Sequence, residues 1–406
     1  MRLYENIEKK MKKYIFLSLF LFGCSTPDFS LPSTMDGSRY PRVSATENGG
    51  LLMSWFEKVD SVQWALQWSE FSKGNWTEGQ TITAGDPYFV NWADFPSIYE
   101  VGGDQLVSHW LQKSGNGPYD YNVQISHSKD RGKSWSGSVI PHGDIDPKGE
   151  HGFLSFFQQQ DASLGFVWLD GRHMGAYDPV NHSMGDMALY RSTMVDGQLG
   201  TEIMLDNRVC ECCPTSSIQT GNSLIIAYRD RSEKEIRDIN IIRYADGEWF
   251  EPYTVHEDNW LIGGCPVNGP MLAAYGNDLA IAWYTSPNET PTVNVAFSHN
   301  DGATFDAPIR VDLSKPIGRV DLTWVSKSEV MVSWIETAEE TTDIVTSIVS
   351  KSGNVQTPRI VSEIQPGRVS GYPQMEMVDD QLFFAWTEGG ENGRVMTKWV
   401  SLSAFR

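Results

Sequence analysis

The residues of this chain best suited to chemistry are four cysteines that fall in two short segments. Cys210, Cys212 and Cys213 have the spacing Cys-x-Cys-Cys, and Cys265 lies in a second segment rich in glycine and proline. Thiols this concentrated can form disulfides in an oxidising compartment or hold a soft metal as thiolates. They can also act as redox or nucleophilic groups. The fifth cysteine, Cys24, stands apart near the N-terminus.

Three interpretations of the four cysteines stay open. Cys265 could form a disulfide with one cysteine of the triplet. The thiolates could instead bind copper(I) or zinc, although Cys-x-Cys-Cys is not a standard zinc-finger spacing. One cysteine could act as a redox group or nucleophile. His151, next to Glu150, could add an imidazole ligand, or it could be a hydrogen-bonded histidine at the rim of the site.

A repeated unit predicts the elements that must position these residues. Each unit has an apolar lead-in segment, a turn and a hydrophobic strand that closes on an aromatic residue. The closing aromatics, 51 to 60 residues apart, are Trp55, Trp110, Trp168, Tyr228, Trp283, Trp334 and Trp386. Such a period filled with short strands predicts a β-propeller. We expect one all-β domain over residues 40–406 with seven blades, or six if one copy is degenerate.

The propeller predicts where the chemistry would lie. Segments that lead into the innermost strands converge on one mouth of the central channel, so the four thiols should lie near one another. Two polar clusters, at 170–173 and 229–238, follow Trp168 and Tyr228. We expect them at the opposite end of those strands from the cysteines, as ion-pair networks or a second ligand surface. The last repeat is short, so a strand from about 29–31 or 39–43 should complete the last blade.

Two turns of related sequence lie between the expected outer strands of the second and fifth blades. Ser128, Asp130, Gly132 and Trp135 match the pattern S-x-D-x-G-x-x-W. A looser copy has asparagine at the Asp position, and its assigned residues are Ser298, Asp301, Gly302 and Phe305. The pattern resembles the Asp-box (BNR) repeat of the sialidase (neuraminidase) superfamily, over roughly residues 40–406. The resemblance implies the fold and not the activity, because these boxes are structural.

The same resemblance implies what a catalytic centre would contain. Enzymes of this superfamily use three arginines to hold a substrate carboxylate, a tyrosine nucleophile activated by a glutamate, and an aspartate as acid/base. The positions that match best are Arg42, Arg319, Arg368, Tyr372 and Asp94. The match is incomplete, since the proline precedes the first arginine here and no full set can be identified. These residues could equally be rim residues that make salt bridges and turn contacts.

Composition limits the partners of the chain. Its formal net charge of −20 opposes binding to the phosphate backbone of nucleic acids. Aromatic residues are 12% and charged residues 21% of the chain, which suits a strand-rich body with a large core. We expect a monomer whose partner is a small molecule, a glycan or a metal ion.

Residues 1–23 resemble a bacterial lipoprotein signal peptide. A cationic start and a short apolar stretch lead to Leu-Phe-Gly before Cys24. The resemblance implies that Cys24 is lipid-modified and that residues 24–39 form a tether. This predicts a lipid-anchored protein of the cell envelope, at the outer membrane of a Gram-negative host. The alternatives are a plain secretory signal and a true start at Met11.

Two functions of different classes follow from these patterns. The first is a binding module that takes a small ligand, a glycan or a soft metal such as copper or zinc at the cysteine-bearing mouth. The second is a glycoside hydrolase of the exo-sialidase type.

Overall fold

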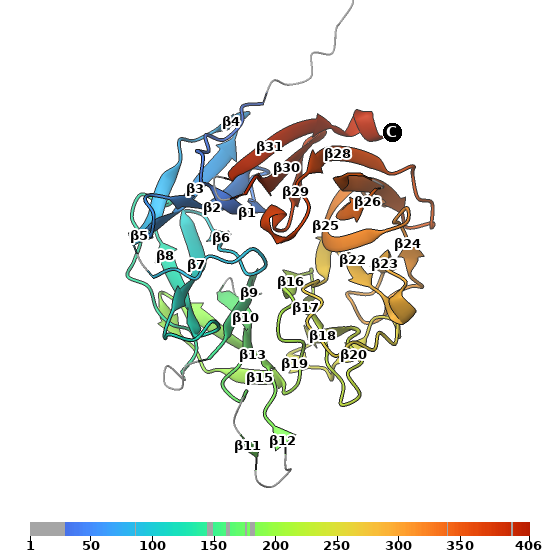
Figure 1. Cartoon of the computed structure of the whole chain (residues 1–406), viewed down its shortest axis with the longest axis horizontal. Coiled ribbons are helices and arrows are strands. Elements are labelled where there is room, and N and C mark those ends of the chain that lie inside the picture. Colours follow the sequence, from blue (N-terminus) through green and yellow to red (C-terminus); the bar gives the residue numbers. More distant parts are fainter. Residues whose placement is uncertain are drawn as a thin grey trace, which may run out of the picture.

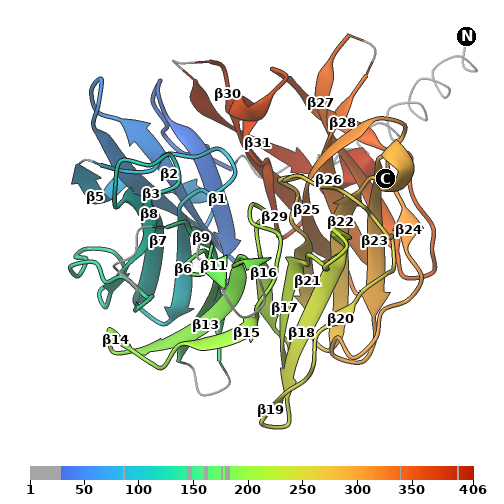
Figure 2. The ribbon, with the colours of Figure 1, turned by 60° about the horizontal axis from the view of Figure 1, so that its bottom comes forward.

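A computed structural model describes residues 29–85, 87–143, 149–159, 163–174, 177–178, 183–338, 340–390 and 393–406. Cys24, with the expected signal peptide and residues 24–28 of the expected tether, lies outside these residues. Seven antiparallel sheets surround a central axis as the blades of a propeller (Figures 1 and 2). The predicted all-β, seven-bladed β-propeller is therefore confirmed. None of the described residues form a helix with the length and apolar character needed to cross a bilayer.

The strands of the first four blades follow one another along the chain. The first blade holds β1 (Arg39–Ala45), β2 (Leu51–Lys58), β3 (Trp64–Ser72), β4 (Asn75–Trp76) and β5 (Gln80–Gly85). The second holds β6 (Ser97–Gly102), β7 (Gln105–Lys113) and β8 (Tyr121–Ser128). The third holds β9 (His151–Gln158), β10 (Leu164–Asp170), β13 (Ala188–Val195), β14 (Gln198–Leu199) and β15 (Ile203–Asp206). The fourth holds β16 (Ser216–Gln219), β17 (Ser223–Arg229), β18 (Ile239–Ala245), β19 (Glu248–Trp249) and β20 (Tyr253–Thr254).

The last three blades complete the ring. The fifth holds β21 (Met271–Tyr275), β22 (Asp278–Thr285), β23 (Thr292–Ser298) and β24 (Ile309–Arg310). The sixth holds β25 (Pro316–Ser326), β26 (Glu329–Thr337), β27 (Thr342–Ser350) and β28 (Arg359–Ile364). The seventh holds β29 (Gln374–Val378), β30 (Gln381–Glu388) and β31 (Arg394–Ser401). Outside the blades lie β11 (Tyr177–Asp178) with β12 (Ser183–Met184), and the 3-10 turns η1 (Pro287–Glu289), η2 (Arg368–Ser370) and η3 (Leu402–Phe405).

The core lies between neighbouring blades because the second strand of each blade is apolar on both faces. Every residue of β10 and of β17 is buried. One core cluster joins Val293 and Val295 of β23 to Val330 and Trp334 of β26, across the contact between blades five and six. Strands covered on both sides read as continuous hydrophobic runs, which is why the repeat was visible in the sequence.

The ring does not close as the sequence predicted. Segment 39–43 is part of β1, the inner strand of the first blade, and the seventh blade keeps three strands. The segment before β1 instead runs beside β31 without forming a ladder. Thr34 Oγ1 donates to Val395 O at 2.9 Å, and Trp399 Nε1 donates to Ser30 O at 2.9 Å. A further bond, from Ser30 N to Gly74 O at 3.0 Å, ties this segment to the first blade.

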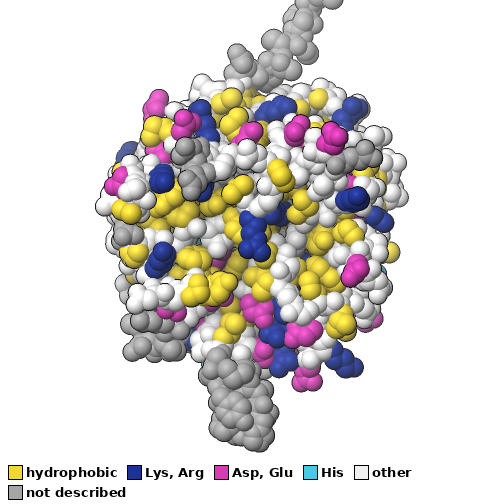
Figure 3. Space-filling model, in the orientation of Figure 1, with side chains coloured by type: hydrophobic (Ala, Val, Ile, Leu, Met, Phe, Trp, Pro, Cys, Tyr) yellow, Lys and Arg dark blue, Asp and Glu magenta, His cyan; other side chains and the backbone are white. Residues whose placement is uncertain are grey.

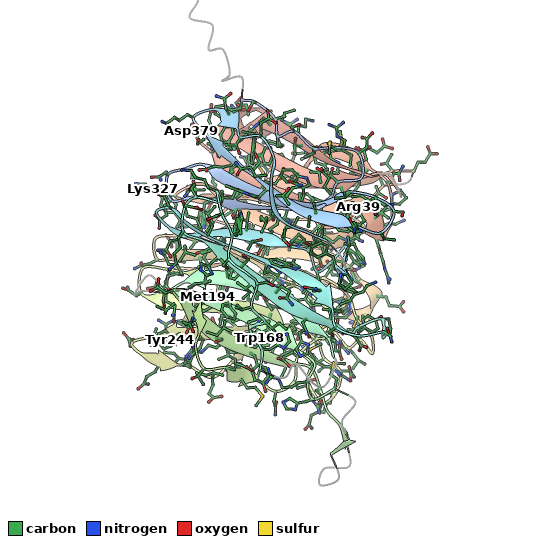
Figure 4. All side chains as sticks on the ribbon, turned by 90° about the vertical axis from the view of Figure 1, so that its left-hand side faces the viewer. Arg39, Trp168, Met194, Tyr244, Lys327 and Asp379 are labelled. Carbon is green, nitrogen blue, oxygen red and sulfur yellow. The ribbon has the colours of Figure 1, made fainter. Side chains whose placement is uncertain are left out.

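The second strand of each blade returns to the mouth from which the inner strand departs. In the third blade, the first residue of β9, His151, pairs with the last residue of β10, Asp170. Figure 4 shows Arg39 at one end of the ring and Lys327 and Asp379, in the turns after β25 and β29, at the other. The prediction that the polar clusters at 170–173 and 229–238 lie opposite the cysteines was therefore wrong. It overlooked that a hairpin brings the chain back to its start.

The two turns with related sequences adopt the same geometry. Ser128 Oγ donates to Asp130 Oδ1 at 2.8 Å and accepts from Gly132 N at 2.8 Å. Ser298 Oγ makes the matching bonds to Asn300 Oδ1 and from Gly302 N, each at 3.0 Å. Asn300, rather than the assigned Asp301, therefore takes the carboxylate's place in the looser copy. Both turns follow the third strand of a blade, and their identity as Asp-boxes stays a prediction.

Candidate functional site

The four cysteines lie together at one mouth of the channel, as the fold predicts. The Sγ atoms of Cys210, Cys212 and Cys213 all lie within 4.8 Å of one another, and those of Cys210 and Cys213 are 3.4 Å apart. Cys265 lies within hydrogen-bonding reach of Cys212. All four are free cysteines, with Cys210 and Cys213 buried and Cys265 exposed.

A close approach of the two cysteine segments makes this cluster possible. A Cβ atom on Gly269 would meet Pro214 O at 2.0 Å, so only glycine permits the contact. The approach brings Asn268 N within 3.4 Å of Cys213 Sγ, to which it donates. The sequence carries this signal as the glycine directly before Pro270.

Positive charge faces the buried sulfurs. Arg237 Nη1 lies 3.3 Å from Cys210 Sγ, and Arg229 is also close enough to act on this thiol. Hydrogen bonds from the thiols of Cys212 and Cys213, followed by the two arginines, hold the pKa of Cys210 well below its usual range. The cluster is thus built to stabilise at least one thiolate.

Two of the arginines on this side of the mouth, Arg231 and Arg237, are paired with carboxylates. Arg237 donates to Glu211 Oε2 at 2.6 Å and to Glu235 Oε2 at 2.9 Å. Arg231 binds Glu211 Oε1 at 2.5 Å and Asp186 Oδ1 at 3.2 Å. The network fits the ion-pair alternative made for the 229–238 cluster, although it surrounds the cysteines instead of facing away from them.

His151 belongs to a neighbouring cluster and not to the group of three thiols. Its Nδ1 lies 3.2 Å from the carbonyls of Tyr121 and Gly149, and its Nε2 lies 3.6 Å from Asp170 Oδ1. Its ring stacks on His142 at a centroid distance of 3.9 Å. The geometry matches a hydrogen-bonded rim histidine.

The opposite side of the mouth carries two arginines that have no carboxylate partner in the part of the chain that the structure describes. Arg319 and Arg368 lie over the same indole, with guanidinium carbons 4.4 and 5.8 Å from the centre of the Trp92 ring. Arg319 is 6% exposed, and its Nη1 donates only to Ser370 Oγ at 3.0 Å and Gly371 O at 2.9 Å. Among the described residues, neither arginine has a carboxylate within 4.0 Å. Figure 3 shows basic side chains at the centre of one face, with mixed acidic and basic ones below them.

The backbone at Arg319 is strained. Its φ of 55° lies in the left-handed region, which is costly for a residue with a Cβ. Arg319 N donates to Asn268 Oδ1 at 2.6 Å, and a Cβ on the preceding Gly318 would meet the same oxygen at 2.2 Å. The fold therefore holds the strained residue in place through the same asparagine that contacts Cys213.

Tyr372 lies between the two sides but lacks the activation that the resemblance implied. Its hydroxyl donates to Val267 O at 2.5 Å, and burial raises the pKa of Tyr372 well above its usual range. Its ring stacks on Trp92 at a centroid distance of 6.2 Å. It supports the mouth as a packing residue, and no glutamate is among the described partners of its hydroxyl.

Arg42 lies in the channel that begins at this mouth. The channel forms a cavity of about 460 Å³ lined by the inner strands of all seven blades. Arg42 donates to Gln374 Oε1 at 3.1 Å and acts electrostatically on Asp321 and Glu376. Burial raises the pKa of Asp321 to about 6 and that of Glu376 to about 7. Of the three predicted arginines, the structure thus brings two to one indole and places the third among carboxyls.

The sequence reasoning missed a tyrosine–glutamate pair at the mouth. Tyr121, the first residue of β8, donates to Glu150 Oε1 at 2.7 Å, and burial raises the pKa of Glu150 to about 7. Asp94, one of the predicted residues, is close enough to act on Tyr121 and accepts from Phe153 N at 2.8 Å. Burial, with Glu150 nearby, raises the pKa of Asp94 well above its usual range. No sequence signal marked Tyr121, because it opens a third strand rather than an inner one.

Comparisons with known proteins support the fold. No protein-family model and no curated protein matches this sequence. Among solved structures, "Hadza microbial sialidase Hz136" is 14% identical, with 86% of this chain and 75% of that chain covered and a TM-score of 0.51. A PL25 ulvan lyase bound to -[GlcA(1-4)Rha3S]- is 10% identical, with 93% and 98% covered and a TM-score of 0.56. Polysaccharide lyase Uly1 is 11% identical, with 95% and 94% covered and a TM-score of 0.55. At such identities the likeness extends to the fold alone.

Proposed function

We propose that this protein binds an acidic saccharide at the mouth of the channel, on the side of Arg319 and Arg368. One observation carries the proposal: Arg319 is a buried cation with a second cation beside it and no carboxylate partner among the described residues. The likeness to glycan-active propellers supports it at the level of the fold.

The electrostatics of the two arginines favour an anionic ligand. Burial of an unpaired guanidinium is unfavourable, and the neighbouring charge of Arg368 adds repulsion. A carboxylate or sulfate between the two guanidinium groups would offset both the burial of Arg319 and the repulsion from Arg368 through charge-assisted hydrogen bonds. The net charge of −20 would repel anions elsewhere on the surface, so such a ligand would concentrate on this local basic spot.

A neighbouring structure supports the choice of ligand class. The PL25 ulvan lyase was solved with a saccharide of GlcA and Rha3S, whose units carry a carboxylate and a sulfate. Because the likeness is one of fold, the two arginines of this chain, and not the lyase, carry the argument.

Binding can be tested with the full mature chain and glucuronate-containing oligosaccharides. We expect titration calorimetry to show binding, and no binding of neutral oligosaccharides of equal length. The exposed side chain of Arg368 allows Arg368→Ala to fold, and we expect it to weaken binding about tenfold. Arg359→Ala is the matched control, because Arg359 is an exposed arginine of the outer strand β28. Equal affinity of Arg368→Ala and wild type would contradict the proposal.

A second candidate function is glycoside hydrolysis of the sialidase type. The observation that favours it is the bond between Tyr121 and Glu150 beside Asp94, since the resemblance implies these three residue types. Tyr121 is 1% exposed and stacks on Phe89 at 4.1 Å, so a substrate would need this site to open. Turnover of a fluorogenic sialoside that is lost in both Tyr121→Phe and Glu150→Gln would support it. No turnover by the wild type would exclude it.

The proposal keeps a lipid anchor at Cys24 in the cell envelope. The apolar stretch before this cysteine supports it. Expression in a Gram-negative host with labelled palmitate should label the wild type and not Cys24→Ala. Release of the unlabelled variant into the periplasm would complete the result. Labelling of both proteins would contradict it.

A further inference from the structure

We propose that the four cysteines at the mouth hold one zinc ion as a tetrathiolate site, with Cys210, Cys212 and Cys213 as a preformed triad and Cys265 as the closing ligand. The site would join the segment before β16 to the segment before β21. The inference does not depend on the proposed saccharide binding.

The positions of the sulfur atoms carry the first part of the argument. Three Sγ atoms within 4.8 Å of one another can all reach a central ion, because Zn–S bonds are about 2.3 Å long. Cys265 Sγ is within hydrogen-bonding reach of Cys212 and lies 3.6 Å from Glu211 Oε2. A turn of its side chain away from Glu211 toward the triad would make it the fourth ligand. Structural zinc sites are closed by four ligands, and these four thiols can supply a full set.

The surroundings supply part of the positive charge that such a site requires, since Arg237 is also paired with Glu211 and Glu235. Zinc with four thiolates carries a net charge of −2, which is unfavourable in a buried site unless cations face it. Arg237 donates to Cys210 Sγ at 3.3 Å, and Arg229 acts on both Cys210 and Cys213. A backbone donor, Asn268 N, faces Cys213 Sγ at 3.4 Å. One guanidinium and one backbone N–H that donate to sulfur, with a second guanidinium nearby, are outer contacts expected of metal-bound thiolates.

The burial of Arg229 argues against a cluster of neutral thiols that holds no metal ion. Arg229 is 1% exposed and donates to three backbone carbonyls, of Asn268, Arg237 and Tyr284. It has no carboxylate partner within 4.0 Å among the described residues, although the buried carboxylate of Asp238 acts on it from farther away. Neutral thiols would leave this buried cation without an anion bonded to it, whereas thiolates on a metal ion would add negative charge close to it.

Binding would involve proton release and no redox step. Each cysteine that binds zinc loses its thiol proton to solvent, and the oxidation states of sulfur and metal do not change. A three-thiolate copper(I) site and a Cys210–Cys213 disulfide are the competing chemistries, and the experiment distinguishes them.

The test uses the mature chain, purified under reducing conditions and supplied separately with zinc and copper(I). Elemental analysis after dialysis should find one zinc per chain, and cobalt(II) substitution should give the visible bands of a tetrahedral thiolate. Cys265→Ser should fold, because Cys265 is exposed, and should weaken zinc binding by at least about 100-fold in competition with a chromophoric chelator. Met271→Leu is the control, since Met271 is a sulfur-containing channel residue outside the cluster, and should bind zinc as the wild type does.

Three outcomes would overturn the proposal. Four reactive thiols without metal after supply of zinc would exclude a metal site. A mass-spectrometric Cys210–Cys213 disulfide in protein isolated from the cell envelope would show that the pair is oxidised. Unchanged metal affinity in Cys265→Ser, with preference for copper(I), would show three-coordinate copper in place of zinc.

Discussion

The two sides of the channel mouth use arginine in opposite ways. On the cysteine side, Arg231 and Arg237 bind carboxylates at 2.5 to 3.2 Å, and Arg229 is held by backbone carbonyls. On the other side, Arg319 and Arg368 lie over Trp92 and bind no carboxylate in the described part of the chain. The same side chain is thus a structural group in one place and an unsatisfied cation in the other.

The difference teaches that the hydrogen bonding of the guanidinium group, rather than its burial, separates the two roles. Arg229 and Arg319 are both nearly inaccessible, at 1% and 6% exposed. Arg229 uses all three nitrogens of its guanidinium group within the protein, whereas the bonds of the Arg319 guanidinium to described residues come from Nη1 alone. A group with unused donors at a mouth is the better candidate for a ligand contact.

The largest expected effect is on stability, from the variant that removes the fully bonded arginine. Arg229→Met should lower the free energy of unfolding by more than about 3 kcal/mol, because it removes three hydrogen bonds to carbonyls, two of them fully buried. Arg319→Met should cost about 1–2 kcal/mol, since it removes two bonds but also an unpaired buried charge. Urea denaturation measures both, and the reverse order would break the comparison.

The next effect is a pH dependence of stability that arises in the channel, where Arg42 acts electrostatically on both Asp321 and Glu376. The pKa of Glu376 is raised to about 7 by burial and by Asp321, against the opposing effect of Arg42 and a bond from Thr323. A carboxyl whose pKa is raised on folding binds more protons in the folded state than in the unfolded state. Stability should therefore fall as pH rises from about 4.5 to about 7 and level off above that range.

Glu376→Gln tests this pH dependence. It should be more stable than the wild type by about 1–2 kcal/mol at pH 8 and equal to it at pH 4. Glu363→Gln, an exposed glutamate of β28, is the matched control. A gain at pH 4 as large as that at pH 8 would assign the effect to packing instead of charge.

The smallest expected effect is a coupling between the cysteine side and the arginine side of the mouth. Asn268 contacts Cys213 through its N–H, Arg229 through its carbonyl and the backbone of Arg319 through its side chain. If both proposals hold, removal of zinc should weaken saccharide binding about three- to fivefold, or under about 1 kcal/mol. Calorimetry with and without a chelator measures this change, and Cys265→Ser without chelator should reproduce it. Equal affinities would show that the two sides act independently.

Sequence reasoning predicted the features that depend on a strand repeat. The seven closing aromatics identify the blades, and the position of Cys213 before β16 and Cys265 before β21 places the thiols at one mouth. Both predictions needed only the order of strands along the chain and the shared direction of the inner strands.

The remaining features depend on contacts between blades, which a one-dimensional pattern does not contain. The pair of Tyr121 and Glu150 joins the second blade to the loop before the third, and Trp92 meets Arg319 from four blades away in the sequence. The wrong placement of the cluster at 229–238 has a simpler cause. Because β16 and β17 form an antiparallel hairpin, the end of β17 lies beside the start of β16, on the same side as the cysteines.

The place where the ring closes, between the segment before β1 and strand β31, has a mechanical consequence. Residues 29–38 run from the outer edge of the ring inward to β1 (Figure 1), held by separate hydrogen bonds to β31 and to the first blade and by the packing of Phe29 on Phe71 and Trp399. A force that pulls on the chain at Phe29 would break these contacts one after another before it acted on β1. A tether leaving from this edge would leave the axial opening unobstructed, so the propeller could turn about its attachment without burying the mouth.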